Sequence, residues 1–180
     1  MTGERRALTL LCALACAACG AHAAPRAPSP VAQANATHEY PSPSPPPQTA
    51  RGGTEAPAQA IREFATAYIN WNARTVSGDM HALAARSVGQ ARAAMTLAAT
   101  ETAGDYELQL GGISNSGTVE AVAPLAGNGR DRFVVVTRES TAATNTTAYQ
   151  GLQPAWHLAL ATVTEQRTGG WVVSGWQPEN

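Results

Sequence analysis

The stretch AIREFATAYINW, residues 60–71, carries apolar side chains at the spacing of an α-helix. Side chains three and four residues apart share one face of a helix. We therefore predict a first helix over residues 55–74, which Thr54 can cap and in which Pro57 is tolerated in the first turn. Its apolar face would contain Ile61, Phe64, Ala65, Tyr68 and Ile69.

Two further helical segments follow. The sequence SGD breaks the first helix, and its aspartate, Asp79, can cap a short second helix. Ser87 and Gln90 have the spacing of a capping box, which predicts a third helix that ends near Thr102. The sequence AGD, residues 103–105, then ends the helical half of the chain.

After residue 105 the apolar pattern changes to a period of two, which is typical of strands with one wet face. Five strands are predicted, over residues 106–110, 118–123, 132–140, 156–166 and 171–177. Turns at 115–117, 128–129 and 168–170 and a long loop at 141–151 connect them. Helices ahead of an antiparallel meander indicate an α+β fold, with N-terminal helices packed on a curved antiparallel sheet.

The predicted strand over residues 132–140 is apolar on both faces at residues 133–136. It should therefore be central in the sheet. One of its faces would pack on the helices, and the other apolar face must be buried against another partner. A second copy of the chain is the simplest one, which predicts a homodimer formed through the sheet.

The N-terminus has the layout of a secretory signal peptide over residues 1–19. Arg5 and Arg6 precede an apolar run at 7–18, which is shorter than the roughly 20 residues that a membrane-spanning helix needs. The sequence AACG resembles a lipobox, in which Cys19 would be lipidated and become the new N-terminus. The following AHA resembles an ordinary signal-peptidase site with cleavage before Ala24. A free secreted product and an uncleaved, membrane-held terminus are the alternatives to anchoring through Cys19.

Residues 20–53 read as a Pro/Ala-rich disordered linker between this leader and a globular domain at 54–180. The proline run PSPSPPP, residues 41–47, favours extended polyproline II and suits a tether. The three cysteines all lie in residues 1–19, so the mature domain would hold no disulfide, thiolate metal site or cysteine nucleophile. A net charge of −1 gives no footprint for nucleic acid.

Candidate chemistry is sparse. A carboxylate base and a hydroxyl donor would be needed for isomerase-type catalysis, and Asp79, Asp105 and Glu139 with Tyr68 are the candidates. Capping at helix ends is the ordinary explanation for the two aspartates, and Glu139, at the end of a strand next to Arg138, is expected to be solvated. His81 and His157 lie on different elements without metal-ligand spacing, and His22 and His38 lie in the leader and linker. Ser174 lacks a nucleophile elbow, so no catalytic residue, metal or cofactor is expected.

The large aromatic side chains carry the more informative signal. Because Trp171 and Trp176 are five residues apart on one strand, they should face opposite sides of the sheet. One would belong to the core, and the other to a dimer face, or to a site for a ligand or partner. The candidate ligand or partner surface comprises Tyr68, Trp71, Trp156, Trp171 and Trp176.

The element order, with AIREFATAYINW, then SVGQARAAM at residues 87–95 and a curved meander, resembles the nuclear transport factor 2-like superfamily over residues 57–177. The resemblance implies a cone-shaped fold with a cavity between helices and sheet. Members include isomerase-like and dehydratase enzymes, ligand-binding and dimerising modules, and extracytoplasmic domains of type IV secretion and conjugation scaffold proteins.

Three functions follow from these patterns. The first is an exported, lipid-anchored, non-enzymatic envelope domain for protein interaction or assembly, dimeric through its sheet, with envelope or secretion-channel proteins as partners. The second is a module that binds a small apolar ligand in a cone-shaped cavity. The third is an enzyme of the isomerase or dehydratase type.

Overall fold

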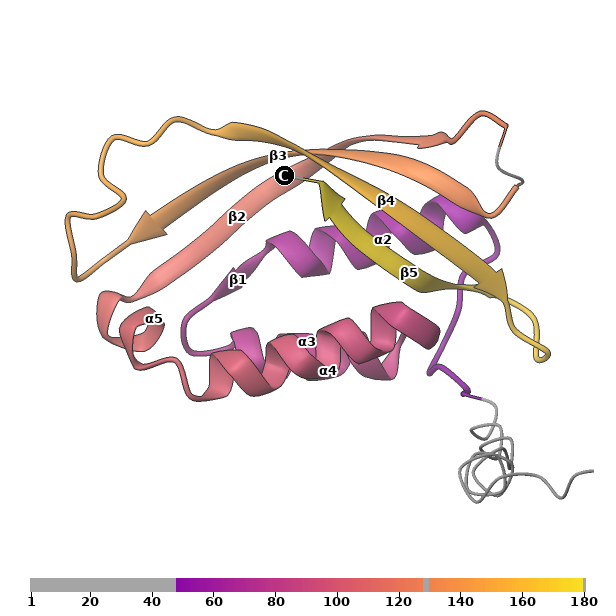
Figure 1. The fold of residues 1–180 in the computed structure, drawn as a ribbon, viewed down its shortest axis with the longest axis horizontal. Coiled ribbons are helices and arrows are strands. Elements are labelled where there is room, and N and C mark those ends of the chain that lie inside the picture. Colours follow the sequence, from indigo (N-terminus) through magenta and orange to yellow (C-terminus); the bar gives the residue numbers. More distant parts are fainter. Residues whose placement is uncertain (1–47, 128–129, 180) are drawn as a thin grey trace, which may run out of the picture. The chain divides into compact units, whose positions relative to one another are not determined.

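The computed structural model of this chain describes residues 48–127 and 130–179. Four helices occur in this part of the chain (Figure 1): α2, Pro57–Ile69; α3, Val76–Ala85; α4, Gly89–Ala103; and α5, Tyr106–Gly111. The leader, all three cysteines, His22, His38 and the turn expected at 128–129 lie outside the described residues.

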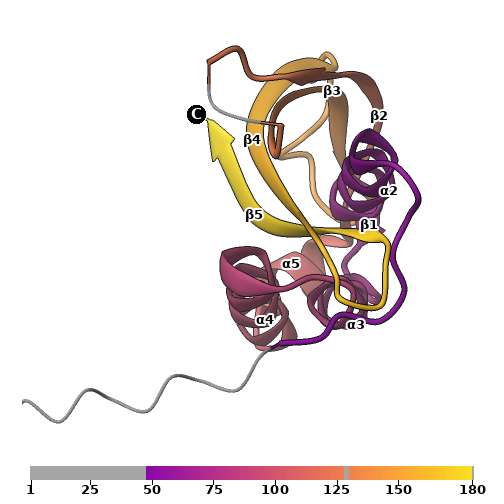
Figure 2. The ribbon, with the colours of Figure 1, turned by 90° about the vertical axis from the view of Figure 1, so that its right-hand side faces the viewer.

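One antiparallel sheet of five strands covers the helices, in the order β1-β2-β3-β4-β5. The strands are β1, Trp71–Asn72; β2, Ile113–Pro124; β3, Arg132–Ala143; β4, Ala155–Glu165; and β5, Trp171–Glu179. The sheet curls around α2, and β5 reaches down to α4 (Figure 2). These features confirm the α+β class and the curved antiparallel sheet, and β3 is central as predicted.

The sheet has two distinct faces, which the ladder registers define. The inner face, toward the helices, includes Phe133 and Val135 of β3, which are 5% and 0% exposed. The outer face includes their neighbours Val134 and Val136, which are only half-buried. The core lies between the inner face and the predicted apolar side of α2, of which Ile61 is fully buried. Burying such a side chain contributes about 1.5–3 kcal/mol to folding.

Residues 106–110 form the helix α5, so the prediction of a strand there was wrong. Asp105 caps this helix, since its Oδ1 accepts the backbone N–H of Leu108 at 2.8 Å. Gly112 ends it in the left-handed conformation, with φ of 60°. Alternating apolar residues over five positions cannot distinguish a strand from a short helix, and here the caps at both ends decide the structure.

The first helix is shorter than predicted. It ends at Ile69 because Asn70 leaves the helical conformation, and the next two residues form β1 beside β2. Ala56 is the N-cap and makes no side-chain capping bond, with proline in the first turn as expected. Thr54 does not cap the helix but pairs instead with Trp171 through two backbone hydrogen bonds.

The expected caps of the next two helices were also wrong. Helix α3 begins at Val76, which places Asp79 in its first turn and not at its cap. Ser87 and Gln90 form no capping box, since the N-cap of α4 is Val88 and has no side-chain bond. Ser87 Oγ donates to the carbonyl of Leu83 at 2.9 Å. Gln90 instead reaches β5, where its Oε1 accepts the Trp176 backbone N–H at 2.7 Å.

Strands β2 and β3 are longer than predicted. The residues expected as a turn at 115–117 belong to β2, and Asn115 pairs with Thr141 of β3. Strand β3 therefore takes up the first residues of the expected 141–151 loop, and the connection to β4 runs from 144 to 154.

The packed region begins before Thr54. Ala50 is 7% exposed and forms a small apolar cluster with Val88 and Val172. The backbone N–H of Arg51 donates to the carbonyl of Ala85 at 2.9 Å. Residues 50–54 are thus attached both to the end of α3 and to the start of β5.

Among the helices of the described residues, none combines the length and the apolar character needed to cross a bilayer.

Candidate functional site

Two β-bulges determine which side chains reach the inner face, one at Glu120 in β2 and one at Ser174 in β5. Between β4 and β5 the register skips Ser174, because Val163 pairs with Val173 while Thr162 pairs with Gly175. An extra residue in one strand reverses the alternation beyond it. Trp171 and Trp176 therefore both pack against the core, and the prediction that they face opposite sides was wrong.

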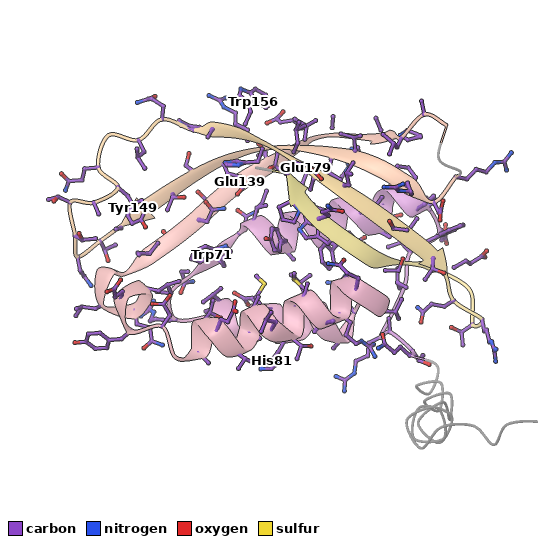
Figure 3. The ribbon with its side chains drawn as sticks, in the orientation of Figure 1. Trp71, His81, Glu139, Tyr149, Trp156 and Glu179 are labelled. Atoms are coloured by element: carbon purple, nitrogen blue, oxygen red, sulfur yellow. The ribbon has the colours of Figure 1, made fainter. Side chains whose placement is uncertain are left out.

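A cleft opens on the inner face near α2, where β4 begins and β5 ends. Its volume is about 140 Å³. Side chains from α2, β3, β4 and β5 line it, and the polar ones are Tyr68, Thr137, Glu139, His157 and, at the rim, Glu179. We call this space the inner-face cleft. Figure 3 shows Glu139 beside Glu179, near the C-terminal end of β5.

The Glu139 carboxylate is half-buried and held at both oxygens. Asn115 Nδ2 donates to Oε2 at 2.7 Å, and Thr137 Oγ1 donates to Oε1 at 2.5 Å. Asn115 is itself fixed, because it also donates to the Ile69 carbonyl at 2.8 Å and accepts from Thr141 Oγ1 at 3.1 Å. Hydrogen bonds to an ionised group are stronger than neutral ones, so this network orients the carboxylate.

Three aromatic rings stand beside this carboxylate. Tyr68 and Trp176 meet edge to face with ring centroids 5.3 Å apart, and Phe64 lies 5.2 Å from Trp176 and 6.4 Å from Tyr68. Trp176 is 3% exposed, and its Nε1–H has no hydrogen-bond acceptor among the described residues. Tyr68 and Trp176 form an apolar wall of the cleft, and Phe64 packs against both of them.

The surroundings of the Tyr68 hydroxyl change its pKa. Burial raises the pKa of Tyr68 above its ordinary value of 10.0. The nearby indole N–H of Trp176 acts in the opposite direction, although it lies outside ordinary hydrogen-bond geometry, and the Glu139 carboxylate raises the pKa further. The hydroxyl therefore stays protonated and can act as a donor at the mouth of the cleft.

No cation pairs with Glu139 within residues 48–127 and 130–179, where the single ion pair joins Arg86 to Glu63 at 3.1 Å. Arg138 follows Thr137 on β3 and therefore lies on the outer face, with its guanidinium 5.8 Å from the ring centroid of Trp156. The same part of the chain also holds no group of three His, Cys, Asp or Glu side chains that suits a metal ion.

Of the other candidate catalytic and metal-binding residues in the described part of the chain, only His157 lies at the inner-face cleft. Asp105 is a helix cap, and Asp79 lies in the first turn of α3, so neither reaches the inner-face cleft. His81 is exposed on the side of α3 away from the sheet, whereas His157 lines the cleft. Of the isomerase set, only Tyr68 and Glu139 come together.

The candidate aromatic surface is likewise divided into separate places. Tyr68 and Trp176 line the inner-face cleft, and Trp71 packs at the edge of the core beside Asn115. Trp171 lines a separate cleft of about 190 Å³ near Arg51 and Arg86. Trp156 projects from the outer face and is 64% exposed (Figure 3).

The outer face is apolar across its middle strands. Register pairs join Ala121 to Val136, Ala123 to Val134, Leu160 to Val134 and Leu158 to Val136. Leu158 is 49% exposed, and Arg138 and Glu179 contribute one charge of each sign beside it.

Sequence reasoning missed Asn115 and Thr137. Asn115 was assigned to a turn, although it is 8% exposed within β2. Thr137 lies two residues from Glu139 on the predicted central strand, and this spacing is the signal that both share a face.

The fold and the cleft together define an α+β domain with a curled sheet and a small carboxylate-bearing cleft. No protein-family model and no curated protein matches the chain.

Proposed function

We propose that this protein is an exported, lipid-anchored, non-enzymatic envelope domain that associates through the outer face of its sheet. The observation that carries the proposal is the exposed apolar surface around Trp156 and Leu158. Contiguous apolar patches on a folded domain mark sites of association. A second copy fits this surface, because a face with charges of both signs can pair with itself about a two-fold axis.

The nuclear transport factor 2-like assignment is part of this proposal. Its support is the sequence resemblance over residues 57–177 and the order of helices before a curled antiparallel sheet. A cone-shaped arrangement with a ligand space between helices and sheet is the finer form of the same assignment, and the position of the inner-face cleft is compatible with it.

The anchoring part rests on the sequence alone. Cys19 after a short apolar run would carry the lipid, and the proline-rich residues 41–47 would hold the domain away from the membrane surface. Envelope or secretion-channel proteins are the partners that we propose for such a tethered domain.

The test uses the full chain, expressed in a bacterial host and isolated from its membrane fraction. Sedimentation should show a concentration-dependent dimer, and Leu158→Glu should abolish it by placing a charge at the interface. Leu97→Glu is the matched control, because Leu97 is 59% exposed on α4, away from the outer face. The proposal fails if the unmodified chain is monomeric throughout, or if both variants dimerise equally.

The N-terminal peptide is identified by mass in the same preparation. A diacylglyceryl group on Cys19 would support the anchor. A mature N-terminus at Ala24 would replace it with a free secreted product.

A second candidate function is the binding of a small molecule in the inner-face cleft. The observation that favours it is an oriented carboxylate with no cationic partner among the described residues, beside an aromatic wall. The third alternative, isomerase or dehydratase chemistry, would have to use Glu139 and Tyr68.

A further inference from the structure

We propose that the inner-face cleft binds a small organic cation, with Glu139 neutralising its charge and the rings of Tyr68 and Trp176 contacting its apolar groups. This inference rests on the second candidate function and not on association through the outer face. It also replaces the apolar ligand expected from the sequence with a charged one.

The carboxylates of the cleft favour a cationic ligand. Glu139 accepts hydrogen bonds from two neutral donors, and a carboxylate has about four acceptor positions, so about two remain for a ligand. Glu179 adds a second carboxylate at the rim. No arginine lines the cleft, and although His157 does, no ion pair of the described residues involves Glu139. A partly buried charge of this kind is stabilised by a ligand of opposite charge.

An aromatic wall borders the Glu139 carboxylate in the cleft. The rings of Tyr68 and Trp176 meet at 62° at one corner of the cleft, where Tyr68 is half-buried and Trp176 is 3% exposed. Tyr68 therefore supplies most of the ring surface that a ligand can contact. Ring faces attract cations electrostatically, and tryptophan does so best, which is how proteins recognise quaternary ammonium groups. The Tyr68 hydroxyl provides a donor beside the carboxylate for a polar substituent of the ligand.

The size of the cleft and the groups that line it favour an organic cation over a metal ion. A space of about 140 Å³ compares with the roughly 150 Å³ that holds benzene in an engineered cavity, so the cleft suits one ammonium head group and its substituents. Ca²⁺ and Mg²⁺ take about six or more oxygen ligands, supplied largely by carboxylates and water. The cleft offers the Glu139 carboxylate and, at its rim, Glu179, and its other lining groups include His157 and aromatic rings. An organic cation therefore fits better than a metal ion.

The experiment compares choline with 3,3-dimethylbutan-1-ol, the neutral carbon analogue of the same shape. Binding to the full chain is followed by the indole N–H signal of Trp176 in ¹⁵N-resolved NMR and by titration calorimetry. We expect choline to bind and to shift this signal, and the neutral analogue to bind about tenfold more weakly or worse, because it lacks the charge. Equal binding of both compounds, or no binding of choline at millimolar concentration, overturns the proposal.

Matched variants locate the site. Glu139→Gln removes the charge at nearly constant shape and should weaken choline binding about tenfold or more. Glu165→Gln removes a carboxylate from the other end of β4 and should bind as the unmodified chain does. Unchanged binding in Glu139→Gln, with the fold intact by NMR, contradicts the assignment. If that variant fails to fold, the comparison of the two compounds on the unmodified chain still decides the question.

Sedimentation of the same samples separates this inference from the association proposed above. Choline binding by a monomer supports the cleft without the dimer. A dimer that binds neither compound supports the outer face and excludes the cleft.

Discussion

Tyr68 links the inner-face cleft to the stability of the protein at alkaline pH. Its pKa in the folded state is raised above 10.0 by burial, so folding favours the neutral phenol. This contribution to the free energy of unfolding is complete below pH 10 and is lost as the pH rises through the folded pKa, because the unfolded chain ionises first.

We therefore expect Tyr68→Phe to reduce the loss of stability that sets in as the pH rises above about 10. Urea unfolding at a series of pH values measures this slope. Tyr106→Phe is the control, because Tyr106 is 71% exposed and should leave the slope unchanged. Equal slopes in the unmodified chain and Tyr68→Phe would show that Tyr68 is not shifted as described.

Gly117 is a single residue on which the position of Glu139 depends. A Cβ atom at Gly117 would lie 2.5 Å from the Arg138 carbonyl oxygen and 3.0 Å from Glu139 Cγ. We expect Gly117→Ala to separate β2 from β3 locally and to lower the free energy of unfolding by about 1–3 kcal/mol. Chemical denaturation measures the change.

The control for this substitution is Gly104→Ala. A Cβ atom at Gly104 meets nothing within 4 Å, and φ is −98° there, so the change should cost little. A comparable loss in both variants would point to a general effect of replacing glycine and not to the close approach at Glu139.

At the scale of single elements, α5 depends on its cap. Asp105→Ala removes the acceptor for the Leu108 N–H and should destabilise this short helix by about 0.5–2 kcal/mol. Amide hydrogen exchange over residues 106–111 should accelerate, while exchange in β3 stays slow. Asp79→Ala is the comparison, since Asp79 makes no capping bond at α3 and should leave exchange in that helix almost unchanged. Unaltered exchange at Leu108 would exclude the cap as the source of α5.

The elements that could be predicted are those with long periodic patterns. The apolar face of α2 correctly predicted a helix, and the continuous apolar run of β3 a strand. Both patterns also predicted that these elements belong to the core. Short elements and register could not be predicted, because they depend on contacts distant in sequence. The bulge at Ser174 is the clearest case, since one unpaired residue brought Trp171 to the same face as Trp176.

The candidate site was predictable only in parts. The sequence paired Tyr68 with Glu139 as part of an isomerase-type set and with Trp176 as part of an aromatic surface, but it did not show that these three residues meet in one cleft. Their meeting depends on the β2–β3 register, which brings Asn115 and Thr141 into the network around Glu139. Such a register follows from the whole ladder and is not visible in any one strand.

For the whole molecule, the two proposed surfaces lie on opposite faces of one sheet but share a boundary. Leu158 and Glu179 belong to the outer face by register and also line the rim of the inner-face cleft. A partner seated on the outer face would therefore lie beside the entrance to the cleft. For this reason, measurements on either surface need the oligomeric state of the same sample.

The attachment of residues 50–54 has a mechanical consequence. In a tethered protein, tension arriving along the N-terminal segment meets the two Thr54–Trp171 backbone hydrogen bonds, at 2.7 and 3.1 Å, before it reaches α2. It also meets the apolar contact of Ala50 with Val88 and Val172. These contacts act as a clamp that must break before the load reaches the helix. A pulling force on the proposed tether would therefore break the contacts at this edge of the domain first, while α2 and the cleft that it borders keep their shape.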